Sequence, residues 1–283
     1  MFAGRYTYLA GGALPATESV RALLEQIAVD TLLGLAGSAG RDLLQALACV
    51  DLPVPPAVVA ALAAAIGGDV QRLIDLALIE PGEDPLSRAP DALRISPLAA
   101  GRLVPLNAAQ WAPLAAILVA PLFTAWGGAA GARPAGADLQ LARLALAAGD
   151  AAVAATCGAS AIRALEADSY PAAAQLGRDV VQLLESAGHP APSPLVAAAV
   201  RVSGAAGDGD TADALLAKGG AALSAAPGAA TPDALALLDE YASRLYQRGQ
   251  LVEALRIRTE EQLPVFERLG DVRSAAVTRG QIA

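Results

Sequence analysis

A pattern of glycine, polar residue and alanine occurs twice in the second half of this chain, at a spacing of about 40 residues. One copy begins at Gly209 and reads Gly-Asp-Thr-Ala-Asp-Ala-Leu, and the other begins at Gly249 and reads Gly-Gln-Leu-Val-Glu-Ala-Leu. Glycine can end one helix, the polar residue can cap the next, and alanine lets that helix approach its neighbour closely. The pattern therefore predicts stacked helical hairpins, each of which buries its apolar face against the next. The residues that define the repeat are Gly209, Ala214, Gly249, Ala254 and Gly270.

Composition favours a helical fold for the whole chain. Hydrophobic residues make up 55% of the sequence and aromatic residues only 4%. Alanine dominates the apolar content, and it is both the best helix former and small enough to allow close helix packing. We therefore expect an all-α protein in which helical repeats cover residues 137–283, with the last repeat truncated.

Residues 19–104 are predicted to form a separate small domain after an N-terminal tail of residues 1–18. Helices are expected near residues 20–35 and 41–50, on either side of a glycine-rich loop, followed by a helix that ends at Ile66 and a helix over 70–78. Two short apolar segments, Leu78–Ile79 and Leu93–Ile95, flank a loop rich in turn residues and predict a β-hairpin. Helices followed by a hairpin is the order of elements in a winged-helix domain.

Residues 105–136 are predicted to form an apolar helix and a glycine-rich linker. No charged residue lies between Arg102 and Arg133, but Pro113 and Pro121 interrupt the apolar stretch. Its densest part is shorter than the roughly 20 residues that a spanning helix needs. We therefore expect a buried helix and no membrane partner. The nearby Trp111 and Trp126, like Tyr241 and Tyr246 further on, are expected in the core.

The segment from Tyr246 to Arg273, which reads YQRGQLVEALRIRTEEQLPVFERLGDVR, resembles a bacterial tetratricopeptide repeat of the longer variety. The resemblance covers little more than one repeat. It implies a tetratricopeptide-type α-solenoid that binds a protein or peptide partner on its concave face.

A second resemblance covers residues 42–55, 72–81 and 93–103, which are similar to the winged-helix segment of STAND-class signalling ATPases. The sequence departs from that family at Ser96, where a histidine is often found. The resemblance implies a connector between an ATPase domain and a repeat sensor. No phosphate-binding loop of the form GxxxxGK[ST] is present, so the ATPase and effector domains are expected outside this sequence.

Residues suited to catalysis are scarce. The one histidine, His189, lies in a proline-rich turn, and Asp208, Asp210 and Asp213 lack the spacing of a calcium loop and are better explained as a capped helix start. The charges of residues 256–268 have the spacing of a solvated helix face, which could also line a ligand groove. We expect no catalytic, cofactor-binding or metal-binding residues, no cofactor and no enzymatic activity.

The net charge of −8 opposes binding to nucleic acid, which depends on Lys and Arg at phosphates. The leading hypothesis is a cytoplasmic protein-binding or sensor module of a STAND-like signalling protein. The alternative is a transcription regulator that inserts its winged helix into DNA. In that case the segment Asp69–Leu78 would be the recognition helix, with Gln71 and Arg72 but also Asp75 available for contacts.

Overall fold

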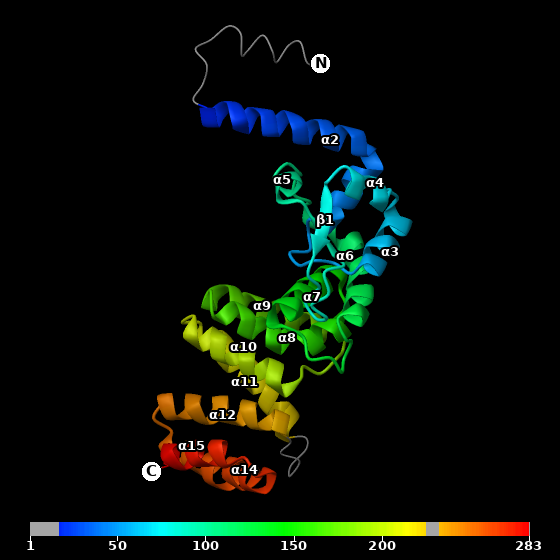
Figure 1. Ribbon diagram of the computed structural model, residues 1–283. Helices are drawn as coiled ribbons and strands as arrows, with labels where there is room; N and C mark the ends of the chain where they lie inside the picture. Colours follow the sequence, from blue (N-terminus) through cyan, green and yellow to red (C-terminus); the bar gives the residue numbers. More distant parts are fainter. Residues whose placement is uncertain (1–16, 225–231, 283) are drawn as a thin grey trace. The chain divides into compact units, whose positions relative to one another are not determined.

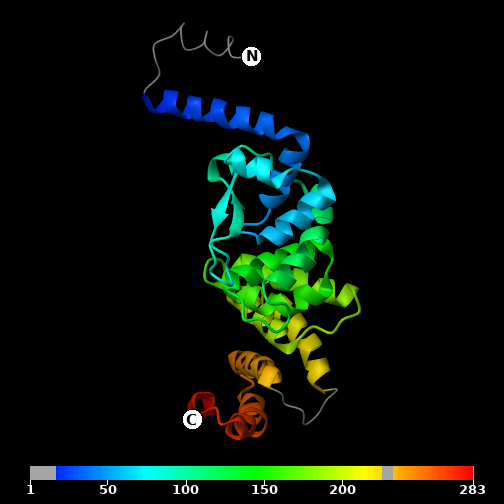
Figure 2. The same cartoon turned by 45° about the vertical axis from the view of Figure 1, so that its right-hand side comes forward.

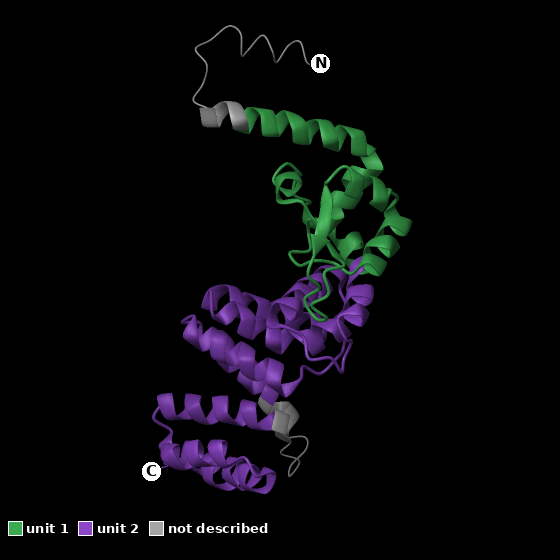
Figure 3. Ribbon diagram, viewed as in Figure 1, with its two compact units in different colours: residues 1–117 green, residues 118–283 purple. Residues whose placement is uncertain are grey.

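The computed structural model describes residues 17–224 and 232–282 and is mostly helical, with 73% helix and 4% strand (Figure 1). The expectation of an all-α protein is therefore confirmed. The chain divides into two compact units, residues 1–117 and residues 118–283 (Figure 3).

Unit 1 contains helices around one small hairpin. The elements are α2 (Thr17–Leu47), α3 (Pro56–Ile66), α4 (Val70–Asp75), β1 (Ile79–Gly82), β2 (Ala92–Ile95) and α5 (Pro97–Ala100). The predicted hairpin is present: β1 and β2 are antiparallel with Ile79 opposite Ile95, and Val54 adds a bridge to Leu93. Large side chains from α2, α3 and α4 fill the core, where Leu43, Leu62 and Leu73 are at most 1% exposed.

A break at Gly37 divides α2 into two helical segments. Gly37 has φ 74° and ψ −174°, values that are open to glycine and costly for other residues. The break removes the helical hydrogen bond to the Leu35 carbonyl, and Arg72 from α4 replaces it with bonds of 3.1 and 2.8 Å. The two helices expected on either side of residues 34–40 are thus present. A break at Gly37, bound by Arg72, joins them in place of the expected loop.

The fourth helix is shorter than the sequence predicts. It begins after Asp69, whose side chain accepts a hydrogen bond from the Arg72 amide, and it ends at Asp75. Ala77 then takes a positive φ of 53° as the chain turns into β1. The hairpin loop is held by Asp84, whose carboxylate accepts bonds from the Leu86 and Ser87 amides at 2.9 and 2.7 Å.

Helix α6 (Ala108–Ala125) runs through both prolines that were expected to interrupt it. Each proline costs roughly 3 kcal/mol in a helix interior. Burial of a leucine or valine returns about 1.5–3 kcal/mol, and α6 buries Ala115, Leu118, Val119 and Leu122 at the i, i+3, i+4 and i+7 positions of one face. The structure therefore buries one face of this helix, and Trp126 directly after it is fully buried.

Among residues 17–224 and 232–282, two helices are long and apolar enough to span a membrane by length and composition alone, namely residues 22–47 of α2 and all of α6. In the most apolar stretch of each helix, 11% of the residues of α2 and 22% of the residues of α6 are buried inside the protein.

The rest of unit 2 consists of helices that pack against their neighbours in sequence. They are α7 (Ala135–Ala148), α8 (Ala151–Glu166), α9 (Tyr170–Ser186), α10 (Ser193–Ala205), α11 (Gly209–Ser224), α12 (Pro232–Gln247), α13 (Leu251–Arg256), the π-helix η1 (Ile257–Gln262), α14 (Leu263–Leu269) and α15 (Val272–Ile282). Three pairs of alternate helices are also in contact, namely α7 with α9, α8 with α10 and α10 with α12. In Figure 2 the helices of unit 2 follow one another in chain order, from green through yellow to red.

The glycine-rich segment before α7 is fixed by a buried arginine. The Arg133 side chain, 4% exposed, forms an ion pair of 2.7 Å with Asp138 and donates hydrogen bonds to the carbonyls of Trp126 and Gly128. Its guanidinium also lies 5.0 Å from the centre of the Phe123 ring. The segment predicted to be a linker is thus a loop bound to the body of unit 2.

Close helix approach in unit 2 depends on glycine. Gly177 of α9 faces α10 so closely that an added Cβ would lie 2.9 Å from the Ala199 Cβ and 3.2 Å from its Cα. The second of these atoms is backbone and cannot move alone. At Gly158 of α8 and Gly219 of α11 an added Cβ would instead meet the ends of side chains, Leu195 at 2.8 Å and Leu237 at 2.6 Å.

We predict that Gly177→Ala lowers the free energy of unfolding by up to about 2 kcal/mol. The change improves helix propensity by up to about 1 kcal/mol, but overpacking costs about 1–3 kcal/mol. Urea unfolding followed by circular dichroism would measure the difference. Gly136→Ala, in α7, is the control because its Cβ would meet nothing within 4 Å, and it should not destabilise. Equal effects of the two substitutions would contradict the close contact.

Candidate functional site

The repeat-defining glycines Gly249 and Gly270 lie at helix ends in the left-handed region, with φ of 75° and 71°. The residue after each glycine donates its amide to the carbonyl five residues earlier, Gln250 to Leu245 and Asp271 to Phe266. This closure satisfies carbonyls that the helix end leaves open. Ala254 is fully buried and lies four residues after Gln250, the residue at the N-terminal cap of its helix.

The same geometry at the earlier copy is shifted by two residues from the sequence pattern. There Gly207 has the positive φ, of 84°, and Asp208 donates to the Ser203 carbonyl. Gly209 is instead the first residue of α11, and Ala214 is exposed, whereas Ala212 is fully buried. Gly209 and Ala214 therefore do not have the helix-ending and packing roles assigned to them.

A regular rule links these helix starts. A buried alanine lies four residues after the capping residue in five helices, at Ala154, Ala173, Ala212, Ala254 and Ala275. Four of the capping side chains, Asp150, Ser169, Asp208 and Asp271, accept a hydrogen bond from the amide three residues on. Counting four residues from the capping residue Asp208, and not from the nearest glycine, would have identified Ala212 in the sequence.

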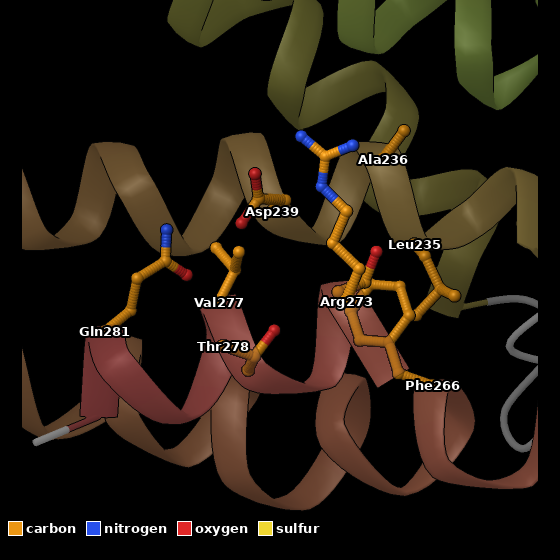
Figure 4. A pocket seen from close by; sticks show the side chains of 9 residues that line it. Leu235, Ala236, Asp239, Phe266, Arg273, Val277, Thr278 and Gln281 are labelled. Carbon is orange, nitrogen blue, oxygen red and sulfur yellow. The ribbon is translucent and has the colours of Figure 1, made fainter. Parts of the chain in front are cut away.

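A cavity lies between α12 and α15, with α14 below it (Figure 4). This groove has a volume of about 370 Å³. The residues that line it are Leu235, Ala236, Asp239, Phe266, Arg273, Ser274, Val277, Thr278 and Gln281. In Figure 4 the two helices run in the same direction, with Leu235 and Arg273 at one end and Gln281 toward the other. We call it the α12–α15 groove.

Apolar and charged groups share the α12–α15 groove. Phe266 and Val277 supply apolar surface, and Val277 is 56% exposed. Asp239 on α12 and Arg273 on α15 lie on the facing helices, and neither forms an ion pair with a residue that the structure describes. A groove with apolar surface and opposite charges without partners is suited to a polypeptide segment.

Elsewhere in unit 2, ion pairs join one helix to another. Arg201 of α10 pairs with Glu166 of α8 and lies 3.6 Å from Glu240 of α12. Lys218 of α11 pairs with Glu185 of α9 at 2.7 Å. The α12–α15 groove differs from these contacts because its opposite charges are not joined.

The π-helix η1 adjoins the α12–α15 groove. Its wide turn is marked by the amide of Leu263, which donates to the carbonyl of Arg258 five residues earlier. Pro264 explains this geometry, because in an α-helix its ring would clash with the carbonyl of Glu260. Phe266, one turn further on, lines the groove.

Arg258 and Gln262 of η1 are buried polar residues. Arg258 is 5% exposed, lies over the Tyr246 ring at 5.9 Å and donates to the Ser243 hydroxyl, so the expectation of a solvated face fails for this residue. The side-chain amide of Gln262 is fully buried and has no hydrogen-bond partner in the described chain. Tyr241 and Tyr246, expected in the core, are 42% and 58% exposed.

The other candidate residues are not brought together. His189 is exposed in its turn, Asp208 caps α11, and Asp213 pairs with Arg244 at 2.7 Å. Within residues 17–224 and 232–282, no group of three or more His, Cys, Asp or Glu residues could hold a metal ion. Burial raises the pKa of the Cys157 thiol to about 12, which makes it unreactive at neutral pH.

The arginines of residues 22–104 are all engaged with other groups of unit 1. Arg88, Arg94 and Arg102 form ion pairs with Glu83, Glu80 and Asp30 at 2.8–3.1 Å. Arg41 and Arg72 donate to the backbone carbonyls of Gly37 and Leu35. Arg72, the cation that the segment Asp69–Leu78 could offer to DNA, is therefore already hydrogen-bonded to the Leu35 carbonyl of α2.

Comparisons of this chain with protein-family models, with curated proteins and with solved structures found no match.

We predict that the stability of the protein falls as pH rises from about 5 to about 8 because of Glu240. Burial raises the pKa of this carboxyl from 4.5 to about 7, an effect that Arg201, shared with Glu166, offsets only in part. Between these two values the folded state holds a proton that the unfolded state releases, so folding is favoured at the lower pH. The loss is at most about 3 kcal/mol, from the free energy of one pKa unit.

Urea unfolding at pH 5 and pH 8 would measure this dependence. Glu240→Gln should remove it, so that the variant gains stability relative to the parent as pH rises. Glu260→Gln, which removes a carboxylate that is 66% exposed, is the control and should leave the pH dependence unchanged. Parallel curves for the parent and Glu240→Gln would contradict the prediction.

Proposed function

We propose that this chain is a protein-binding module whose α12–α15 groove receives a segment of a partner. The observation that carries the proposal is the groove itself, where exposed apolar surface lies between opposite charges that form no ion pair with each other or with other described residues. Its mechanism is recognition, in which the groove contacts a partner through apolar surface and charge.

In this proposal the helices of unit 2 are repeats of a tetratricopeptide-type α-solenoid. Support comes from the buried alanine four residues after the capping residue in five helices and from the contacts of α8 with α10 and of α10 with α12. The shared direction of α12 and α15, with α13 to α14 between them, also fits two successive repeats (Figure 4). The groove would then lie on the face formed by the first helices of those repeats.

Unit 1 is proposed as a winged-helix-like connector of a STAND-like signalling protein. The order of three helices and a hairpin supports a winged helix, and the engagement of all five arginines of residues 22–104 supports a connector over a DNA reader. The alternative of a transcription regulator requires cations that are available for phosphate contacts. The five arginines of residues 22–104 instead form ion pairs or hydrogen bonds within unit 1.

We predict that the full chain does not retard duplex DNA in an electrophoretic shift assay at about 50 mM salt, where counterion release is most favourable. The net charge of −8 gives the same expectation. Salt-sensitive retardation that weakens on Arg72→Ala would establish the transcription-regulator alternative.

We predict that the full chain selects peptides from a random displayed library and that Val277→Arg abolishes their binding. Arginine at this position fills the groove, and the fold should persist because Val277 is 56% exposed. Val252→Arg is the matched control, since Val252 is 85% exposed and does not line the groove. Failure to select any peptide, or equal loss with both variants, would refute binding in the groove.

A further inference from the structure

The apolar part of the α12–α15 groove is small and lies toward one end. Leu235 is buried beside Phe266, and Val277 continues the apolar surface toward the middle of the groove (Figure 4). A surface of three side chains can bury one or two apolar residues of a partner. It is too short for the four anchors at i, i+3, i+4 and i+7 that a docked amphipathic helix presents.

Polar side chains follow the rest of the groove. Ser274, Thr278 and Gln281 occur along α15, and Asp239 faces them from α12. An extended segment needs partners for its own amides and carbonyls, whereas a helix satisfies them internally. Thr278 is only 4% exposed and the Ser274 side chain already bonds Asp271, so the exposed Gln281 amide and the half-buried Asp239 carboxylate provide the donors and acceptors. The lining therefore fits an extended peptide better than a helix.

Arg273 and Asp239 indicate which charges the peptide should carry on the two sides of its apolar residue. Arg273 lies at the apolar end, near Leu235 and Phe266, and Asp239 lies further along α12 (Figure 4). Arg201, Lys218 and Arg244 each pair with a carboxylate of another helix, but Arg273 pairs with none in the described residues. A carboxylate beside the apolar residue of the partner would supply the missing charge, in the planar geometry that arginine favours.

We propose that the α12–α15 groove binds an extended peptide segment in which an apolar residue is flanked by an acidic residue for Arg273 and by a basic residue for Asp239. The apolar side chain contacts Leu235, Phe266 and Val277. This inference rests on the proposed function and specifies the chemistry of its partner.

The test is an oriented library of nonapeptides with a fixed central leucine, bound to the full chain and sequenced. The parent protein should enrich Asp or Glu on one side of the leucine and Lys or Arg on the other. Arg273→Glu should weaken binding of the enriched acidic peptide by about tenfold, the scale of one desolvated charge pair, and should select Lys or Arg in place of the acid. Arg273→Glu combined with Asp239→Lys should exchange the two preferences.

Arg268→Glu is the matched control, because it makes the same change of charge on α14 at an exposed position outside the groove. It should leave the enriched sequences unchanged, and circular dichroism would establish that all variants fold. Peptides that bind the groove without a charge preference, or whose preference persists in Arg273→Glu, overturn this inference and leave the proposed function standing. Absence of any bound peptide overturns both.

Discussion

Close approach between helices is the constraint on which unit 2 depends. Its helices meet at glycine and alanine, and the absence of a Cβ at Gly177 allows contact with the Ala199 backbone. Alanine supplies little apolar area, so a chain of this composition can form a core only if its helices lie close together. The buried alanines after the helix caps meet this requirement at each successive turn.

Ion pairs join some of the closely packed helices of unit 2 to one another. Arg201 bridges two carboxylates from the helices on either side of it, and one of them, Glu240, is buried enough to hold a proton near neutral pH. Between α12 and α15 the charges Asp239 and Arg273 face the same space without joining. Arg279 of α15 still pairs with Glu267 of α14, so among the described groove residues only the facing charges of α12 and α15 are left for another molecule to pair with.

Local features of the fold could be predicted from the sequence, and features that need distant residues could not. Turn residues and caps located α3, the hairpin and the helix ends at Gly249 and Gly270, because these depend on a few neighbouring residues. An apolar helix was predicted here, but not that it runs without a break through Pro113 and Pro121, because burial of one face by distant residues offsets the prolines. The bond from Arg72 to Leu35 joins residues 37 positions apart, and no local pattern shows it.

The candidate site shows the same limit. The sequence identified Gly209 and Ala214 where the structure requires Gly207 and Ala212, because a second glycine two residues later imitates the pattern. None of the groove residues was singled out as a binding residue, since Asp239, Phe266 and Arg273 come from three helices whose arrangement is tertiary. Tyr241 and Tyr246 were misassigned to the core because aromatic spacing alone does not tell which face of α12 is covered.

The π-helix η1 has a consequence for how this region tolerates changes in length. A π-turn holds one more residue than an α-turn over the same rise, so it is equivalent to a single-residue insertion in a regular helix. One residue removed between Ile257 and Gln262 would close the wide turn, so the residues after it would keep the face that they present to α12 and α15. One residue inserted into the regular helix α13 has no such turn to absorb it, and it would rotate everything after it by about 100° about the axis. Phe266 would then point away from the groove that it lines.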